Sequence, residues 1–438
     1  MQNWLKSFFY AAILCCGSMT FGSIIAFGSA TLRIIKVTFG PLSTFTVGAF
    51  QAAPAFIGIF APIFWNYLMK RKRLKICASI VGLSGAVFWL LLLTMNKKYF
   101  WLTIVFRGFL GTTLAGVSAI CPMYLGQIAP PEKKGLFCTF HIIFIVVGHI
   151  VSNLLGVTHK WQPPIYTCAA FMLIFGTGVY LIPDNQTKVR HEYDGNDSSF
   201  EEVYEEDDNE VQLKNAGQES EKESSQMSLF DKSIRKQAIV SMLLLLLMQL
   251  SGIGSIMQNI APMMSEVGLD IDAGYQATIA ICAQLISSVL SSMLIDKYGC
   301  RILWLVSSFG SFASLLLYGL NVKFGWSRWL PMILLFVFQF VFGIGMGPVP
   351  WIVPTHVFPP QILRNAISLG TSCTWFASSI VVFLFPFLQK WFGQFGLMMI
   401  LTGVNFISFL VGFFFLNDYS RKTLMISNET NQEISDIE

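Results

Sequence analysis

Two carboxamide side chains lie deep inside long apolar stretches, where uncompensated polar groups are costly. Gln249 directly follows the run Met242–Met248, and Gln284 lies within the apolar stretch 275–295. A carboxamide both donates and accepts hydrogen bonds without carrying a charge, so it suits the hydroxyl groups of a neutral ligand. The alternative role is a hydrogen bond between two helices, which in membranes is worth about 0.6 kcal/mol on average. These two positions are therefore the first candidates for contact with a small polar molecule.

Patterns typical of enzymes are missing from the sequence. No apolar stretch pairs a nucleophile with a base, there is no HExxH, and no glycine-rich loop ends in Lys-Ser or Lys-Thr. The nine cysteines form no CxxC pair, so neither a zinc site nor a disulfide framework is indicated. The net charge of +4 is small and the basic residues lie in short loops, which does not predict a nucleic-acid surface. We expect no catalytic residue, no metal and no cofactor.

Composition places the chain in a lipid bilayer. Of the 438 residues, 54% are hydrophobic and 12% are charged, whereas soluble domains carry roughly a quarter charged residues. A helix needs about 20 apolar residues to cross a bilayer. Twelve stretches are near that length: 8–30, 42–69, 76–95, 99–123, 136–157, 163–182, 236–258, 275–295, 302–321, 329–354, 366–388 and 392–416. The sequence predicts an all-α membrane protein with twelve transmembrane helices.

The stretch 184–235 separates two sets of six helices. It holds the acidic run Glu201–Asp208 and almost nothing that could form a core, so it is predicted to stay solvated. We interpret it as a linker, with a docking or phosphorylation role around Ser198 and Ser199 as the alternative. The predicted organisation is a six-helix bundle over 1–183, the linker over 184–235, a second bundle over 236–416 and a tail over 417–438.

Basic residues in the short loops predict the orientation. Five cations lie between Lys70 and Lys75, after the second stretch, and Lys133 and Lys134 follow the fourth. Lys and Arg in short loops favour the cytoplasmic side of a membrane. These loops, the linker and both termini are therefore predicted to be cytoplasmic, and the plasma membrane is the expected location of this multi-pass protein.

The two halves resemble each other at equivalent places, as in transporters built from related bundles. Three pairs of segments correspond: Asn66–Arg71 with Asp296–Arg301, Gln127–Pro130 with His356–Pro359, and Pro183-Asp184 with Asn417-Asp418. One such pair would be weak evidence, but three pairs at equivalent places indicate an internal repeat.

Further segments together resemble the sugar porter family of the major facilitator superfamily. They are Arg107 with Gly111, Pro122-Met123-Tyr124, Ala129-Pro130-Pro131 with Gly135, Gln249-Leu250-Ser251-Gly252, Gly347-Pro348-Val349-Pro350-Trp351 with Phe358-Pro359, and Lys422-Thr423-Leu424. The resemblance covers nearly the whole chain except the linker and the first stretch. It implies a twelve-helix major facilitator fold in two six-helix bundles, similar to that of facilitative glucose and hexose transporters.

The resemblance also implies a substrate site. Gln249 and Gln284 would bind sugar hydroxyls, and Trp351 and Trp375 would cover the apolar C–H face of the ring, with interfacial anchoring as the alternative for the tryptophans. Gly347 belongs to the same site. It lies beside two prolines that remove amide donors, so the tenth stretch is expected to bend there.

Several positions depart from the family pattern. Counted without gaps from Gly135, Ile142 takes the place of a fifth-span Gln, and Thr374 takes the place of the Asn before Trp375. Met248 and Gly254 likewise replace family amides in the seventh stretch. His149 is a candidate for a compensating polar group, with simple packing as the alternative. Ile142, His149 and Thr374 therefore join the candidate substrate contacts, and the identity of the sugar stays open.

In the family, acid–base pairs at the cytoplasmic ends of the two bundles hold the outward-open state. These pairs break as the carrier opens to the inside. The candidates for this gating role are Asn66, Lys70, Arg71, Arg107, Gln127, Lys134, Asp296, Arg301, His356 and Arg364. Asn66, Gln127 and His356 stand where the family often has acids. We therefore expect these residues to hold the cytoplasmic ends of the two bundles together less strongly than in the family. For the cations, the alternative explanation is the bias of basic residues toward the cytoplasm.

The function favoured by this resemblance is facilitative transport of a monosaccharide, such as the hexose glucose, by alternating access. The alternatives are a carrier of another neutral polyhydroxylated or small polar solute, a proton-coupled sugar symporter, and a non-transporting sugar sensor, which would be expected to have a long signalling tail. The expected partners are the sugar and the lipid bilayer, and the sequence indicates no oligomeric state.

Proton coupling usually needs a carboxyl group inside a span, because burial raises its pKa toward neutrality. We find no Asp or Glu in the twelve stretches, and Glu266, Asp270 and Asp272 are predicted to lie in a loop. Uniport is therefore expected. His141 and His149 are the groups that could still couple protons, since histidine titrates near neutral pH.

The orientation can be tested with an accessible tag inserted near Gly217 in the linker. We expect a membrane-impermeant reagent to reach the tag only after the cells are permeabilised, because the basic loops predict a cytoplasmic linker. Labelling in intact cells would reverse the predicted orientation.

Overall fold

The computed structural model describes residues 2–129, 134–182, 235–358 and 360–416. All regular elements in these residues are helical. They are α1 (Gln2–Phe39), α2 (Thr44–Gly58), α3 (Ala61–Arg71), α4 (Leu74–Leu91), η1 (Leu92–Thr94), α5 (Phe100–Ile128), α6 (Lys134–Gly156), α7 (Gln162–Gly178), η3 (Val179–Leu181), α10 (Arg235–Leu250), α11 (Ile253–Val267), α12 (Ala273–Phe324), α13 (Leu330–Ile344), α14 (Val349–Val357) and α15 (Pro360–Phe415). The acidic run of the predicted linker, and the predicted tail with Lys422-Thr423-Leu424, lie outside the described residues.

Eleven helical stretches of the described chain are long and apolar enough to cross a membrane. The last, Ala366–Phe415, has 50 residues. At 1.5 Å per residue it would be about 75 Å long if straight, more than twice the ~30 Å hydrocarbon thickness. Its backbone leaves the helical region at Gly393 (φ 67°, ψ 179°), so it makes two crossings. The described chain thus has the twelve transmembrane helices that the sequence predicts.

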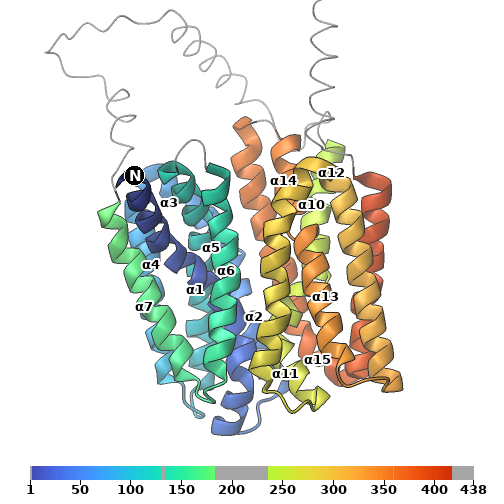
Figure 1. The fold of residues 1–438 in the computed structure, drawn as a ribbon. Coiled ribbons are helices and arrows are strands. Elements are labelled where there is room, and N and C mark those ends of the chain that lie inside the picture. Colours follow the sequence, from blue (N-terminus) through green and yellow to red (C-terminus); the bar gives the residue numbers. More distant parts are fainter. Residues whose placement is uncertain (1, 130–133, 183–234, 359, 417–438) are drawn as a thin grey trace, which may run out of the picture.

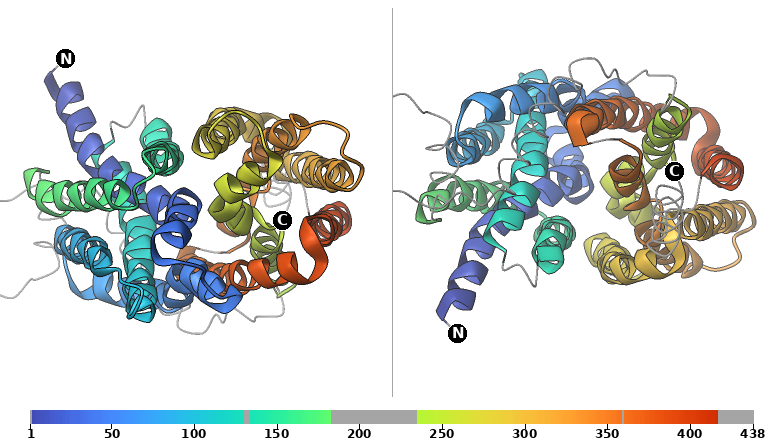
Figure 2. Two further views of the ribbon diagram at one scale, coloured as in Figure 1. Left: turned by 90° about the horizontal axis from the view of Figure 1, so that it is seen from below. Right: turned by 90° about the horizontal axis from the view of Figure 1, so that it is seen from above.

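The crossing helices form two bundles that stand side by side. Figure 1 shows α1 to α7 in one bundle, the N-terminal half, and α10 to α15 in the other, the C-terminal half. The halves meet where α1 packs on α11, α2 on α15 and α6 on α12. Views along the helices show α15 reaching across to α2 (Figure 2). We call the end of the molecule where η3 stops and α10 begins the linker end, and the other end the opposite end.

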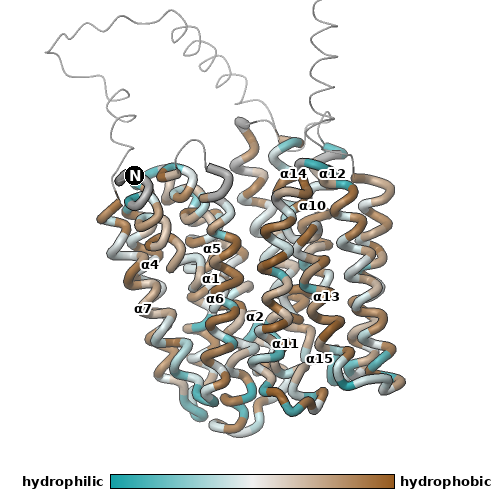
Figure 3. Tube along the Cα trace, in the orientation of Figure 1, coloured by the Kyte–Doolittle hydropathy of each residue, from teal (hydrophilic) through white to brown (hydrophobic). Residues whose placement is uncertain are grey.

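Each half has its own apolar core. Trp89 and Phe50 are fully buried in the N-terminal half, and Trp304 and Phe338 are fully buried in the C-terminal half. Hydrophilic segments lie mostly toward the two ends of the molecule, and apolar segments fill the length between them (Figure 3). This distribution suits a protein whose middle faces lipid and whose ends face water.

Glycines allow neighbouring helices to come into backbone contact within each half. A Cβ added at Gly148 of α6 would overlap the carbonyl oxygen of Met19 on α1, and one added at Gly111 of α5 would overlap that of Pro54 on α2. Lipid tails are as apolar as the side chains, so helix association in membranes relies on such close packing. These glycines fix the distances between the helices that carry the N-terminal side of the candidate site.

Two crossings of the C-terminal half are interrupted. The bend predicted in the tenth stretch is confirmed, because α13 ends at Ile344 and α14 starts only at Val349. The seventh stretch was expected to be continuous, but it is broken between α10 and α11. Gly252 has a φ of 90°, a left-handed conformation that glycine adopts without strain. The dipeptide Ser251-Gly252 was the sequence signal for this break.

Two boundaries differ from the sequence-based expectation. The first crossing was expected to end near residue 30, but α1 continues to Phe39. Its last turns bury Leu32 and Ile35 while the basic Arg33 and Lys36 stay exposed, so a helix persists where the charges alone suggested a loop. Glu266, expected in a loop, lies exposed in the last turn of α11.

The close contact of α6 with α1 predicts the effect of Gly148→Ala. The added methyl group must push against the backbone of Met19, and we expect a loss of about 1–3 kcal/mol in stability, the usual cost of overpacking. Thermal unfolding of the purified protein in detergent measures this loss. Gly403→Ala is the matched control, because a Cβ added at Gly403 meets nothing within 4 Å. An equal fall in the two variants would contradict the assignment.

Candidate functional site

Gln249 lies where the broken seventh crossing turns from α10 into α11. Its carbonyl oxygen accepts a hydrogen bond from the Gly252 amide at 3.2 Å, which closes the turn. A Cβ added at Gly254 would lie 3.4 Å from Ser378 Oγ and 3.6 Å from Gln249 Oε1. The Gln249 amide and the Ser378 hydroxyl therefore both lie close to the backbone of residue 254, which carries no side chain. Both groups can donate and accept hydrogen bonds there.

Trp375 of α15 lies at the contact between the halves. Its ring centroid is 6.2 Å from that of Phe21 on α1, and a Cβ added at Gly58 of α2 would lie 3.3 Å from its indole. Phe21 in turn makes an edge contact with the ring of His141 on α6, again at 6.2 Å. His141 is buried, with its Nδ1 2.8 Å from Ser18 Oγ. Aromatic and polar groups from both halves therefore meet around Phe21.

Gly347 and Trp351 belong to the interrupted tenth crossing. The amide of Gly347 donates to the carbonyl oxygen of Phe342 at 2.9 Å, one residue wider than an α-helical hydrogen bond. Trp351 is 38% exposed on α14. Its indole is therefore only partly covered by neighbouring residues, and the expected contact with a sugar stays a prediction.

Gln284 and Thr374 differ in whether the polar atoms of their side chains already have a hydrogen-bond partner. Oε1 of Gln284 is buried and has no hydrogen-bond partner among the described residues. Its Cγ lies 3.5 Å from where a Cβ at Gly343 would be, so it packs against α13. The hydroxyl of Thr374 donates to the Gly370 carbonyl oxygen of its own helix at 2.8 Å. Gln284 keeps an acceptor for a ligand, whereas the donor of Thr374 is already used.

The two candidates on α6 have different surroundings. Ile142 is 47% exposed, so this apolar side chain is not packed into either core. His149 is buried and interacts with the backbone of Met257 on α11 in the other half. Its Nε2 lacks a hydrogen-bond partner in the part of the chain that the structure describes. His149 therefore lies at the contact between the halves, rather than packed within one of them.

The candidate gating residues are only partly described. Arg71 lies over the ring of Tyr67 at 4.5 Å, and Arg301 donates to the Phe413 carbonyl oxygen at 2.8 Å, so each binds within its own half. Gln127 and His356 are exposed near the linker end, and Asn66 is half-buried on α3. The side chains of Lys70, Lys134, Asp296 and Arg364 lie outside the described residues, and the expected acid–base pairs stay a prediction.

Arg107 does not belong with the linker-end candidates, and its grouping with them is corrected. It lies on α5 about 30 Å from the linker end of that helix, at 1.5 Å per residue. It is fully buried, donates through Nε to the Phe50 carbonyl oxygen at 2.6 Å and stacks over the rings of Phe27 and Phe50. An arginine inside a span costs about 2.5–3.5 kcal/mol. These contacts offset part of that cost, while Nη1 has no hydrogen-bond partner among the described residues. Arg107 therefore ties α1, α2 and α5 together.

Several buried polar groups were not identified from the sequence. They are Ser18, Gln51, Gln258, Asn259, Gln339 and Ser378. Gln339 is fully buried on α13, and neither its Oε1 nor its Nε2 has a partner among the described residues. Polar residues scattered in apolar stretches were the available signal, but only the helix contacts show which of them face the other half.

Comparisons with known proteins show the family and the fold of this chain. Residues 8–430 match the family described as sugar (and other) transporter. The sugar transporter ERD6-like 16 of Arabidopsis thaliana is 27% identical over 415 residues, covering 89% of this chain and 83% of that protein. The facilitated glucose transporter member 2 of solute carrier family 2 from Rattus norvegicus is 26% identical over 398 residues, covering 85% and 73%. The crystal structure of a D-xylose-proton symporter matches with a TM-score of 0.75 at 18% identity, covering 94% and 98%, which shows a shared major facilitator fold.

The position of Gln249 predicts that Gln249→Ala weakens sugar uptake. Losing one hydrogen bond to substrate costs roughly 1–2 kcal/mol, so the concentration for half-maximal uptake should rise about tenfold while surface expression stays normal. Uptake of labelled glucose measures this. Gln389→Ala is the control, because the Gln389 amide bonds to Gln394 instead, at 3.1 Å. An unchanged affinity in Gln249→Ala would make Gln249 a packing residue.

Proposed function

Because the chain belongs to the sugar transporter family, we propose that it carries a monosaccharide across a membrane by alternating access and without proton coupling. The substrate we propose is a hexose such as glucose. The observation that best supports this is that the Gln249 amide and the Ser378 hydroxyl both lie close to Gly254, at the break in the seventh crossing. Uncharged groups that both donate and accept hydrogen bonds match the hydroxyls of a sugar.

Aromatic rings support the same substrate class. A pyranose ring has apolar C–H faces that an aromatic plane can cover. Phe21 and Trp375 come from different halves, with ring centroids 6.2 Å apart. A sugar held beside them would touch both bundles at once. Alternating access needs a substrate site at the interface of the two repeats, around which the bundles rock.

The contacts between the two halves suggest toward which end of the molecule the substrate site opens. The halves are joined by Gln51 with Asn259 and by Ser29 with the amide of Ala261, between the middle of the helices and the opposite end. We propose that the substrate site opens toward the linker end in this state. If the basic loops are cytoplasmic, as their charge predicts, this is an inward-facing carrier.

We propose that transport is not coupled to protons because the membrane-spanning helices carry almost no acidic residues. Glu266 is the one Asp or Glu in the spans of the described chain, and it is exposed in the last turn of α11. His141 and His149 are the groups that favour the alternative, a proton-coupled symporter, because both are buried and His149 interacts with the backbone of Met257 in the other half. Histidine is the side chain most easily switched near neutral pH.

Membrane location and domain boundaries complete the proposal. We place both termini on the cytoplasmic side of the plasma membrane, with bundles over 1–183 and 236–416 and the acidic linker between them. The role is transport rather than catalysis, and no cofactor takes part.

Proteoliposomes test both the transport and its driving force. Labelled glucose should equilibrate across the membrane, and with equal glucose inside and out an inward proton gradient should produce no net accumulation. A carrier that uses protons would instead accumulate sugar above equilibrium, and a protonophore would abolish that excess. That result would exclude uniport and point to His141 and His149, whereas no glucose flux at all would exclude glucose as the substrate.

A further inference from the structure

An open cavity lies at the opposite end of the N-terminal half. Its volume is about 500 Å³, and it is lined by the last turns of α1, by the loop between α6 and α7, and by the start of α7. Small-ligand sites in proteins have volumes of about 300–1,000 Å³. None of the candidate sugar contacts lines this cavity. It is therefore a place for a ligand other than the transported sugar.

Two neighbouring side chains of the cavity can only donate hydrogen bonds. Lys160 is exposed, whereas Trp161 is 9% exposed and its ring packs against that of Phe39 at 6.0 Å. Neither the Lys160 ammonium nor the Trp161 indole N–H has a hydrogen-bond or ion-pair partner among the described residues. Both groups are donors without acceptor capacity, and no carboxylate lines the cavity. A ligand that satisfies both donors is an oxyanion, such as a phosphate group.

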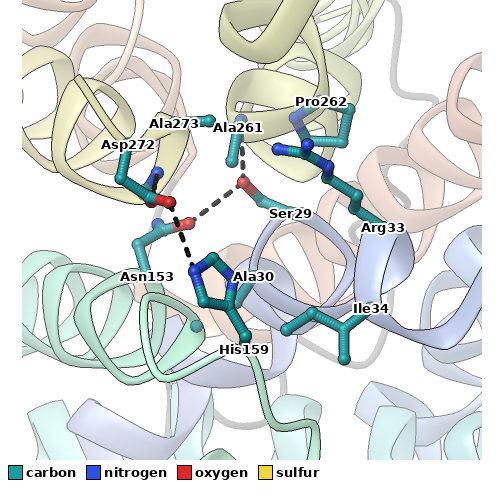
Figure 4. Close-up of a pocket in the computed structure, with 12 residues that line it drawn as sticks. Ser29, Ala30, Arg33, Ile34, Asn153, His159, Ala261, Pro262, Asp272 and Ala273 are labelled. Atoms are coloured by element: carbon teal, nitrogen blue, oxygen red, sulfur yellow. Dashed lines mark hydrogen bonds and ion pairs between the residues drawn. The ribbon is translucent and has the colours of Figure 1, made fainter. Parts of the chain in front are cut away.

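The Asp272 carboxylate of the other half does not supply this acceptor. His159 lies between the cavity and a neighbouring pocket, and Figure 4 shows its ring directed at Asp272 in that pocket. The His159 nitrogen is 3.9 Å from Asp272 Oδ2, and Asp272 Oδ1 accepts from the Gly274 amide at 2.8 Å. Both carboxylate oxygens thus face other groups, and Lys160 is left for a ligand.

The charge of the N-terminal half also favours an anion at this end. The chain has no Asp or Glu in residues 1–131 or 133–183. The opposite end of this half nevertheless carries five exposed cations, Arg33, Lys36, Lys97, Lys98 and Lys160. The bias of basic residues toward the cytoplasm does not explain them, because it predicts cations at the linker end. The α7 N-terminus, which has no side-chain cap, adds a partial positive charge beside the cavity.

The surroundings of the cavity match the level of lipid headgroups. Tyr166, one turn into α7, is 56% exposed, and Val37, in the last turn of α1, is 82% exposed. Polar segments lie toward this end and apolar ones fill the middle of the molecule (Figure 3). Tyr and Trp are enriched where a membrane meets water, and Lys at the end of a span extends its ammonium to that level. A phosphate here would carry its acyl chains past exposed apolar side chains.

We propose that this cavity binds the phosphate group of an anionic phospholipid, with the Lys160 ammonium and the Trp161 indole N–H as its donors. A zwitterionic lipid carries an ammonium beyond its phosphate, which the cations of this end repel, whereas phosphatidylglycerol carries none. Free phosphate offers the same oxygens but has no chains to lie against Tyr166 and Val37. The inference depends neither on the sugar nor on how the carrier moves it.

Hydrogen exchange of the purified full-length protein in lipid nanodiscs, followed by mass spectrometry, tests the site. When phosphatidylglycerol replaces part of the phosphatidylcholine, peptides covering 157–162 should exchange about fivefold more slowly, the factor that one net hydrogen bond supplies. Lys160→Ala should remove this slowing. Trp161→Phe keeps an aromatic ring but loses the N–H, so it should weaken the slowing, and it remains informative if Lys160→Ala folds poorly.

A matched variant and a second probe separate this site from general charge effects. Lys390→Ala removes one exposed cation at the same end of the molecule, but from the C-terminal half, and it should keep the slowing. Inorganic phosphate added to pure phosphatidylcholine discs should leave exchange at 157–162 unchanged, and slowing by it would overturn the lipid as the ligand. Equal exchange in the two lipid compositions, or slowing that survives both Lys160→Ala and Trp161→Phe, would overturn the site itself.

Discussion

The hydrogen-bonding needs of the backbone inside a membrane constrain the rest of this structure. No water is available in the hydrocarbon core, so a peptide group that leaves the helical ladder must find a partner within the protein. The chain leaves the ladder between α13 and α14, and Ser307 and Ser291 supply partners there. Ser307 Oγ accepts from the Met346 amide at 2.9 Å, and Ser291 Oγ donates to the Ile344 carbonyl oxygen at 2.8 Å. This helix break at membrane depth is therefore paired with hydroxyls on a neighbouring helix, α12.

The same constraint determines where the substrate groups can lie. At the break between α10 and α11, Asn405 of α15 donates to the Ser251 carbonyl oxygen at 3.2 Å, and Gly252 takes the left-handed conformation. With its backbone completed in this way, the turn holds the side chain of Gln249 close to Gly254. The side-chain amide of Gln249, which we propose as a substrate contact, is not needed to complete this backbone turn. A polar site in an apolar bundle thus depends on side chains, such as that of Asn405, that complete the backbone around it.

The sequence predicted the architecture well because the fold follows from a strong, local signal. Runs of about 20 apolar residues predicted the twelve crossings, and the prolines at 348 and 350 predicted the break in the tenth. The break at Gly252 and the last turns of α1 were missed, because a single glycine or two cations weigh little against a long apolar run. Arg107 was misplaced since its partners, the backbone of Phe50 and the rings of Phe27 and Phe50, are distant in sequence. The polar layer of Gln51 and Asn259 had no sequence signature, because its geometry exists only when the halves meet.

Whether a backbone group at a helix break keeps its hydrogen bond depends on which half of the molecule supplies the partner. The break between α13 and α14 is completed by α12, which belongs to the same half, so it persists whatever the halves do. The Gln258 carbonyl oxygen, which Pro262 leaves without a helical donor, accepts from Gln51 of the other half, so this hydrogen bond lasts only while the halves are in contact. No backbone group can be left unpaired in lipid. Where its partner belongs to the same half of the molecule, this requirement gives a rigid scaffold. Where the partner lies across the interface, the same requirement links the hydrogen bonding of a single helix to the position of the two bundles.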